Sequence, residues 1–201
     1  ETPPGVRLAL ENSSGGGDEV GASLEDLARI LDGVADASGR LVFCLDTAHL
    51  WGAGHDIGSA AGAAALVDRA AALVGLDRVA LLHLNDSKAP LGSRWDRHEH
   101  VGAGRIGPEG LGALLRDERL RHTTFILETP GVDEGYDVIN MRRARALFGG
   151  ASALPQLPAA AFRLTRRSTR SMPRSRSGAR PAAAHGVVTE TAEQAEPGIA
   201  G

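Results

Sequence analysis

The sequence predicts an α/β fold in which four strand-then-helix units form half of a (β/α)8 barrel. Short, continuous apolar runs alternate with segments of helical spacing, a pattern typical of parallel strands buried on both faces and joined by helical crossovers. The four units occupy residues 1–150 of the 201-residue chain, whereas a closed eight-stranded barrel needs about 250 residues. We therefore expect a four-stranded parallel sheet rather than a complete barrel.

Polar residues mark the ends of all four expected strands. In a parallel barrel the carboxyl ends of the strands share one face, which is where active sites lie. We therefore expect the side chains at these ends to meet at one mouth. The apolar runs cover residues 6–10, 41–45, 79–82 and 124–127, and they lead into Glu11, Asp46, His83 and Glu128.

Helical spacing is present in each intervening segment. Ser23 precedes the first helix as a capping residue, and Pro108 begins the third, where its missing N–H would have no partner in any case. Each helix follows a strand, which favours right-handed crossovers. The expected helices are 24–31, 64–74, 111–115 and 138–148.

The composition changes after Gly149. Residues 151–201 are rich in Ala, Pro, Ser and Arg, with a strongly basic stretch at 163–180 that gives way to an acidic, Ala-rich end. Such segments lack the apolar surface that a packed core needs. We expect a folded domain over 1–150 and a disordered tail over 151–201, whose basic stretch either attracts DNA phosphates or is a solvated extension.

Bulk properties limit the partners of the chain. With 42% hydrophobic residues and a net charge of -3, it can form one ordinary core but has no overall basic excess, so any contact with nucleic acid must be local. The single cysteine, Cys44, excludes an internal disulfide and fits a reducing compartment, which predicts a cytoplasmic protein. No apolar run of about eighteen residues and no export signal is found, so no membrane partner is expected.

Eight side chains at or just after the strand ends are candidate metal ligands. All offer oxygen or imidazole nitrogen, the mixture that suits Zn, Mn or Fe. Taken alone, Asp-x-x-His is usually a helix cap and Asp-Arg-His a surface ion pair. The whole set favours a metal centre, because carboxylates gathered at one mouth repel one another unless cations compensate them. The candidates are Glu11, Asp46, His49, His83, Asp86, Asp96, His98 and Glu128.

Successive local motifs follow an order that resembles endonuclease IV, the AP endonuclease family 2 of the xylose isomerase-like TIM barrels. The resemblance covers about residues 5–148 and implies the C-terminal half of the family's barrel. The motifs are ENSSGGG from Glu11, LDTAH ending at His49, AGHD ending at Asp56, HLNDSK from His83, GSRWDRHEH ending at His100, GAGRIG from Gly102 and LET at 127–129.

The resemblance implies a site of three zinc ions that cuts DNA on the 5′ side of abasic sites and leaves a 3′-hydroxyl. Glu11 would bridge two zincs, and Glu128 would be both a ligand and the group that orients the attacking water, so these two are the expected catalytic residues. The family's first zinc also needs two histidines on earlier strands, which have no counterpart in this sequence. By motif, Asp46, His83 and Glu128 join Glu11 at the second zinc, and His49, Asp96 and His98 hold the third.

The expected partner is double-stranded DNA with abasic sites, bound by a monomer. Lys88, Arg94 and Arg97 are the DNA-binding candidates, although pairing with Asp96 or Glu99 is an equally good interpretation of the arginines. Trp95 either faces the DNA or packs under its loop. No nucleotide cofactor is expected, because the Gly-rich loop at 13–17 lacks a Gly-Lys-Ser/Thr ending. The remaining histidines match no ligand position of the family, namely His55, His100, His122 and His185.

Two other hypotheses fit part of the pattern. A sugar isomerase or epimerase of the xylose isomerase-like barrels would use Glu11, Asp46, His83 and Glu128 around a divalent metal, but it would leave the Asp96–His98 motif without a role. Alternatively, the chain is an inactive remnant, because half a barrel exposes two sheet edges and an apolar interior.

Overall fold

A computed structural model of the chain describes residues 3, 5–34 and 39–166, with side chains given to residue 163. These residues belong to one compact unit, Glu1–Ser171, whereas the second unit, Met172–Gly201, lies outside the described part. None of the described helices is both long enough and apolar enough to cross a lipid bilayer.

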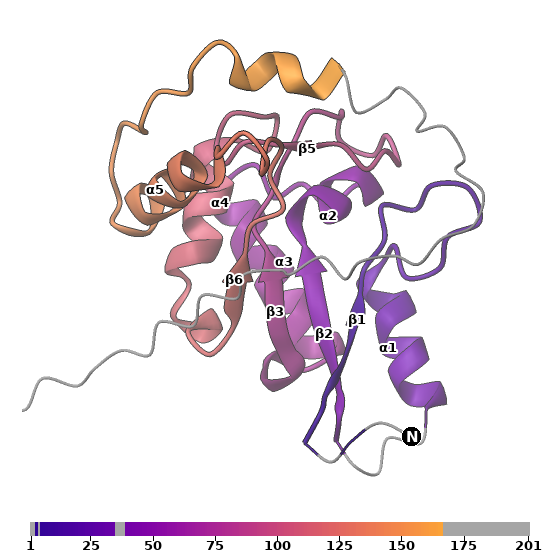
Figure 1. Cartoon of the computed structure of the whole chain (residues 1–201). Helices are drawn as coiled ribbons and strands as arrows, with labels where there is room; N and C mark the ends of the chain where they lie inside the picture. The colour runs from indigo at the N-terminus through magenta and orange to yellow at the C-terminus, as the bar shows by residue number, and fades with distance from the viewer. Residues whose placement is uncertain (1–2, 4, 35–38, 167–201) are drawn as a thin grey trace, which may run out of the picture. The chain divides into compact units, whose positions relative to one another are not determined.

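A four-stranded parallel sheet forms the centre of the unit, as the sequence predicts (Figure 1). The strands lie in the order β1, β2, β3, β6, and every adjacent pair is parallel. The register pairs Glu11 with Cys44 and Asp46 with His83, so the ligand-type residues end at nearly the same level. The strands are β1 Leu8–Glu11, β2 Leu41–Asp46, β3 Val79–His83 and β6 Thr124–Ile126.

Four helices, one after each strand, pack in a layer against the sheet. Within this layer α1 contacts α3, α3 contacts α4 and α4 contacts α5. Leu27, Phe43 and Leu111 are fully buried in the resulting core, and this apolar burial is the main stabilising contribution. The helix α4 begins at Gly107, with Pro108 in its first turn. The helices are α1 Leu24–Gly33, α3 Ala60–Leu73, α4 Gly107–Arg116 and α5 Asp137–Phe148.

Side-chain caps mark where α1 and α3 start. Ser23 and Asp26 form a reciprocal capping box at α1, which satisfies backbone N–H groups that have no partner inside the helix. The sequence predicted that the second helix would begin at residue 64. This helix, α3, begins at Ala60, because the Ser59 side chain accepts the Gly62 N–H and caps the helix there. Alanine-rich sequence before residue 64 supplied no apolar spacing from which to predict this turn.

The structure contains several short elements that the sequence did not predict. The helix α2, Thr47–Ala53, follows β2 directly, and the strands β4, Asp86–Ser87, and β5, His98–Glu99, pair antiparallel. Single-turn 3-10 helices lie at Leu76–Arg78 and Glu118–Leu120. All of these are too short to show a hydrophobic period, yet α2 and β5 carry two of the predicted ligands.

Residues 151–166 correct the expectation of a disordered tail beginning at residue 151. Pro155 accepts a hydrogen bond from the Arg143 guanidinium, and the fully buried Ala161 accepts one from His100 Nε2 at 3.3 Å. A 3-10 helix, η3, spans Ala161–Arg166. Composition misled here because the segment is fixed by contacts with the domain and not by a core of its own. The remainder of the predicted tail, 167–201, lies outside the described residues.

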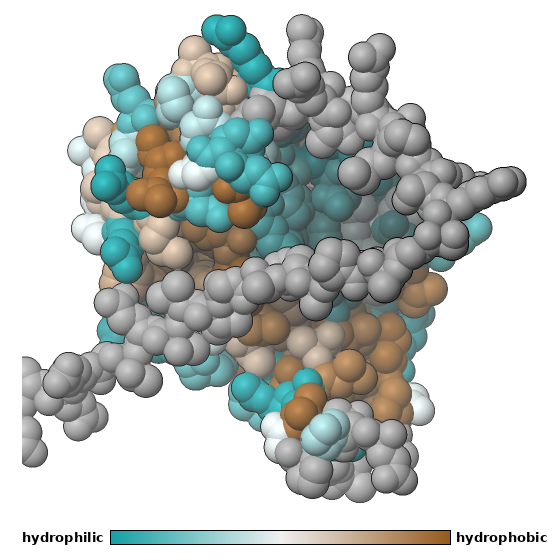
Figure 2. Space-filling view, viewed as in Figure 1, coloured by the Kyte–Doolittle hydropathy of each residue, from teal (hydrophilic) through white to brown (hydrophobic). Residues whose placement is uncertain are grey.

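The sheet face opposite the helices carries no helical layer within the described part of the chain (Figure 1). Figure 2, viewed from the same side, shows apolar side chains over the lower part of the strands. Leu8 on the edge strand β1 is 68% exposed. An apolar sheet face of this kind is what half of a closed barrel presents.

Candidate metal centre

Four side chains from the ends of the four strands converge, as the sequence predicts. Nδ1 of His83 lies 3.1 Å from Oε1 of Glu11 and 3.0 Å from Oε2 of Glu128. The same nitrogen is 3.6 Å from Oδ2 of Asp46. One ligand atom from each of the four residues lies within 4.8 Å of the others, which is the spacing of donors that share a cation.

Asp46 is both a helix cap and part of this cluster. Its carboxylate is fully buried, with Oδ1 accepting the His49 N–H at 2.9 Å to cap α2. The other oxygen, Oδ2, accepts from the Asn85 side chain at 2.7 Å and faces His83 and His98. The cap and metal-ligand interpretations of the Asp-x-x-His motif are therefore compatible, because each uses a different oxygen.

His49 and His98 form a second group with Asp96. Backbone carbonyls bind Nδ1 of both imidazoles, Asn12 O at 3.0 Å for His49 and Glu128 O at 2.9 Å for His98. These bonds place a proton on Nδ1, so Nε2 is the nitrogen that would bind a metal once it has lost its own proton. Oδ1 of Asp96 lies 3.5 Å from Nε2 of His49 and 3.2 Å from Nε2 of His98.

The buried Nε2 of His98 faces carboxylate oxygens. Oδ1 of Asp96 lies 3.2 Å from it, and a nitrogen gathered with carboxylates suits a site in which a cation can replace the proton. The same Nε2 lies 3.6 Å from Oδ2 of Asp46, and Asp46, His49 and His98 also offer ligand atoms within 4.8 Å of one another. The residues present therefore fit a bound metal ion.

The imidazoles of this cluster bind protons more tightly than free imidazoles do. Burial disfavours the imidazolium of His83, but its hydrogen bonds, above all to Asp46, raise its pKa far above the ordinary value. Burial likewise opposes the charged form of His49, yet the Asp96 hydrogen bond and the Asp46 charge raise its pKa to about 9. A site that keeps imidazoles protonated at neutral pH attracts cations generally.

The carboxylates respond in the opposite direction. Hydrogen bonds from His49 and His98 hold the pKa of Asp96 far below its ordinary value. Burial would raise the pKa of Asp46, but the His83 hydrogen bond and the charges of the other two imidazoles lower it overall. The pKa of Glu128 is lowered chiefly by its hydrogen bond to His83. The carboxylates are therefore ionised at neutral pH, as metal ligands must be.

Asn12 and Asn85 position the ligands, and the sequence analysis missed both. Asn12 accepts the Asp46 backbone N–H at 2.7 Å and returns its side-chain amide to the Asp46 carbonyl at 3.4 Å. Asn85 accepts the Glu128 N–H at 2.9 Å while its amide binds Oδ2 of Asp46. The available signal was position, because each asparagine lies one or two residues after a strand-end ligand.

Asp86, a candidate ligand by sequence, serves the fold instead. Its buried carboxylate accepts backbone N–H groups of Ser87, Gly104 and Ile106 at 2.7–2.9 Å. Burial raises the pKa of Asp86 and these bonds oppose the rise. A Cβ on Gly104 would lie 2.5 Å from Oδ1 of Asp86, so the loop can close on the carboxylate only with glycine there.

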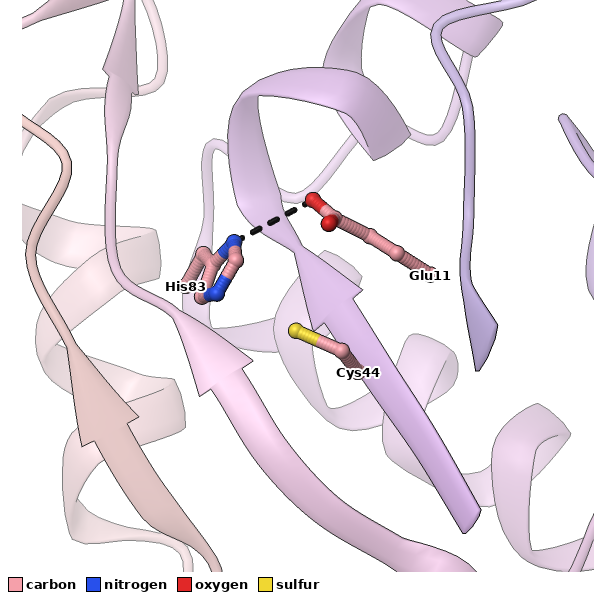
Figure 3. Close-up of side chains that lie close together, drawn as sticks. All are labelled: Glu11, Cys44 and His83. Carbon is pink, nitrogen blue, oxygen red and sulfur yellow. Dashed lines mark hydrogen bonds and ion pairs between the residues drawn. The ribbon is translucent and has the colours of Figure 1, made fainter. Parts of the chain in front are cut away.

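Cys44 adds a sulfur atom that the sequence analysis did not include among the donors. Its Sγ forms a further group with Glu11 and His83 in which the ligand atoms lie within 4.8 Å of one another (Figure 3). Burial raises the pKa of the Cys44 thiol, although the His83 hydrogen bond partly opposes this. The sulfur therefore keeps its proton at neutral pH, and a neutral thiol is a weak ligand beside ionised carboxylates.

The predicted DNA-binding cations lie around the ligand loop. Arg94 and Arg97 are exposed, and Arg97 donates to the Asp96 backbone carbonyl at 2.9 Å. Neither arginine pairs with the carboxylates of Asp96 or Glu99 within the described part of the chain, which removes the alternative interpretation. Lys88 does approach Glu99, at 3.8 Å.

The other histidines do not join the centre. His100 is fully buried, where the Asn140 side chain binds its Nδ1 at 2.9 Å and Ala161 O binds its Nε2. Nε2 of His122 binds the Leu76 carbonyl at 2.7 Å. Burial lowers the pKa of His55, and His185 lies outside the described residues.

Comparisons with known proteins show which family the chain resembles. The family model of the xylose isomerase-like TIM barrel matches residues 2–147. A protein of Moorella thermoacetica named probable endonuclease 4 is 49% identical over 129 residues, which is 64% of this chain and 46% of that protein. A protein of the same name from Natranaerobius thermophilus is 42% identical over 149 residues, or 73% of this chain and 51% of that protein.

A solved structure gives the same result. The crystal structure of endonuclease IV from Thermus thermophilus aligns with a TM-score of 0.61 and 43% sequence identity, covering 71% of this chain and 50% of that one. The chain thus spans about half the length of the curated relatives it matches.

Proposed function

The chain belongs to the xylose isomerase-like TIM barrel family, and from this membership we propose that it is the metal-binding half of a zinc-dependent DNA repair endonuclease. The reaction proposed is hydrolysis of the phosphodiester on the 5′ side of an abasic site. The resemblance to endonuclease IV is confirmed by the relatives and the structure of that name. The observation that supports the reaction is the convergence of all seven predicted ligands in two groups, in which imidazole nitrogens face carboxylate oxygens.

Two metal positions follow from the two groups of side chains. His49, Asp96 and His98 would hold one zinc. The strand-end group, which includes Glu11, would hold another. Bound zinc would neutralise the phosphodiester and lower the pKa of a coordinated water. The strand-end group consists of Glu11, Asp46, His83 and Glu128.

Glu128 is the side chain best placed to handle the attacking water. Its carboxylate is exposed, ionised, and 3.0 Å from Nδ1 of His83, so it can accept a hydrogen bond from a water at the mouth. Its backbone is fixed by the Asn85 side chain and by Nδ1 of His98. A base held in this way keeps the water aligned for in-line attack.

The partner proposed is double-stranded DNA with an abasic site. Lys88, Arg94 and Arg97 would contact phosphates next to the metals, as local positive charge on a chain whose net charge is -3. We further propose that the protein acts as a monomer in the cytoplasm, where the single buried Cys44 stays reduced.

The sugar isomerase alternative does not explain why Asp96 lies close to two histidines. An isomerase needs only the strand-end group, whereas Asp96 lies 3.2 Å from His98 and 3.5 Å from His49. These contacts favour a further metal, and phosphodiester hydrolysis uses several.

The direct test is nicking of a duplex that carries one tetrahydrofuran abasic analogue. Zinc-loaded chain should cut the strand on the 5′ side of the analogue, leave an end that a DNA polymerase extends, and spare an intact duplex of the same sequence. Glu128→Gln should lower the rate by roughly 10²- to 10⁴-fold. Elemental analysis and thermal unfolding should accompany the assay, since a folded, zinc-loaded chain that cuts neither duplex would contradict the proposal.

A further inference from the structure

Trp95 is the large aromatic side chain nearest in sequence to the metal centre, and it is 63% exposed. It directly precedes the candidate ligand Asp96, and its exposure excludes one of the two interpretations, that it packs under its loop. The second tryptophan, Trp51, is only 8% exposed and donates its Nε1–H to the Ala89 carbonyl at 3.0 Å. Exposed indole surface forgoes the stabilisation that burial gives, so its position calls for a partner.

The backbone around Trp95 is held firmly against α2. Gly92 N–H donates to the Trp51 carbonyl at 3.0 Å, and Arg94 N–H donates to the Gly52 carbonyl at 2.9 Å. A Cβ on Gly52 would lie 3.2 Å from the Trp95 carbonyl oxygen, so the close approach depends on glycine. Trp95 is therefore exposed by a defined loop and not by a loose one.

Arg94 contributes to this defined geometry. Its backbone has a φ of 59°, within the left-handed region, and it is the one described non-glycine residue with positive φ. Such a conformation costs free energy and persists only where surrounding contacts impose it. The hydrogen bond to Gly52 is one such contact, and the result is that Trp95 is presented outward.

The charges next to Trp95 indicate the chemistry of its partner. Arg94 directly precedes Trp95, Arg97 follows it by two residues, and both arginines are exposed. Oδ1 of Asp96, which lies between Trp95 and Arg97 in the sequence, is 3.2 Å from Nε2 of His98. An exposed aromatic residue with arginines close to it in the sequence, next to the proposed phosphodiester-binding site, suits a nucleic acid, whose phosphates would bind the cations and whose bases would stack on the ring.

We propose that Trp95 stacks on an unpaired nucleobase of the DNA bound at the metal centre. This inference rests on the proposed function and adds a contact that reads the lesion. Base pairs inside an intact duplex have both faces covered by their neighbours, whereas an abasic site removes one base from the stack and leaves the opposite base without a partner. The exposed indole therefore favours damaged DNA over intact DNA.

The test combines binding with intrinsic fluorescence, using zinc-loaded full chain and dye-labelled duplexes. One duplex contains a tetrahydrofuran abasic analogue, and the other is intact and of equal length. Trp95→Ala should weaken binding of the abasic duplex by about 5- to 140-fold, the range that base–aromatic stacking gives. It should weaken binding of the intact duplex much less. Trp95→Phe should recover part of the preference.

Two controls separate stacking from other causes. Phe148→Ala removes another aromatic side chain that is 63% exposed, at the end of α5, and should leave both affinities unchanged. Zinc content should be equal in all variants, which excludes an effect through Asp96. The emission of the wild-type protein should be quenched by the abasic duplex, and Trp95→Phe, which retains only Trp51, should show no such quenching.

The results distinguish this inference from the proposed function. If the abasic duplex is bound and cut but Trp95→Ala keeps the full preference, or emission does not change at saturation, the stacking role is overturned and the endonuclease assignment stands. If the zinc-loaded chain binds and cuts the abasic duplex no better than the intact duplex, both the stacking role and the proposed endonuclease function are overturned.

Discussion

Asn85 donates its side-chain amide to Oδ2 of the buried Asp46 at 2.7 Å. Its carbonyl oxygen accepts the Glu128 N–H at 2.9 Å, so one residue that touches no metal position fixes ligands from two strands. Second-layer hydrogen bonds of this kind set the orientation of the ligands, and their loss lowers metal affinity.

Asn85→Ala should therefore lower zinc affinity by roughly 10- to 100-fold, because Asp46 and Glu128 lose a shared anchor. Competition with a zinc-binding dye measures the affinity, and thermal unfolding measures stability. Asn140→Ala is the matched control, since Asn140 is also fully buried but binds His100 and Val101. Equal zinc affinities in the two variants would contradict the positioning role of Asn85.

His98→Ala should reduce the zinc content of the purified chain by about one ion, because the metal position shared with His49 and Asp96 loses a ligand whose buried Nε2 lies 3.2 Å from Oδ1 of Asp96. Elemental analysis after gel filtration measures the content. His122→Ala, which removes an exposed imidazole bound to the Leu76 carbonyl, should leave it unchanged. An unaltered zinc content in His98→Ala would exclude His98 as a ligand.

The metal-free chain should become less stable as the pH rises from 6.5 to about 9. The pKa of His49 is raised from 6.5 to about 9 in the folded state, so its charged form stabilises the fold fully below pH 6.5 and this contribution is lost as the pH rises through about 9. Melting temperatures measured with a chelator across this range should fall, and His49→Gln should flatten the curve.

Zinc should remove this pH dependence of the melting temperature, because a metal takes the place of the protons. The zinc-loaded chain should show little change in melting temperature between pH 6.5 and 9. Zinc binding at pH 7 should release protons, which calorimetry detects as a dependence of the heat on the buffer. A binding heat that is the same in buffers of different ionisation enthalpy would contradict proton displacement.

The domain boundary can be tested by truncation. A chain that ends after Gly150 loses the Pro155 and Ala161 carbonyls that bind Arg143 and His100, and unsatisfied buried donors cost about 1–3 kcal/mol each. It should melt at a lower temperature than a chain that ends after Ser171, the limit of the compact unit. Identical melting curves would restore residue 150 as the end of the folded domain.

Much of the architecture could be predicted from the sequence because it depends on local periodicity. The continuous apolar run at 41–45 gave β2, and the spacing of Leu24, Leu27 and Leu31 gave α1. The short elements α2 and β5 could not be found in this way. They have seven and two residues, which is too few to show a periodic pattern of apolar side chains.

The sequence by itself determined the types and order of the seven candidate ligand residues and the four strands whose ends lie at or close to four of them. Only the tertiary structure decided how each residue is used. Asp46 and Asp86 are both carboxylates that follow an apolar run, yet one turns an oxygen toward His83 and the other binds backbone N–H groups of Gly104 and Ile106. The physical reason is that an isolated motif specifies only the charge and the length of a side chain. The partner of a buried charge depends on residues that the fold brings close from distant parts of the chain.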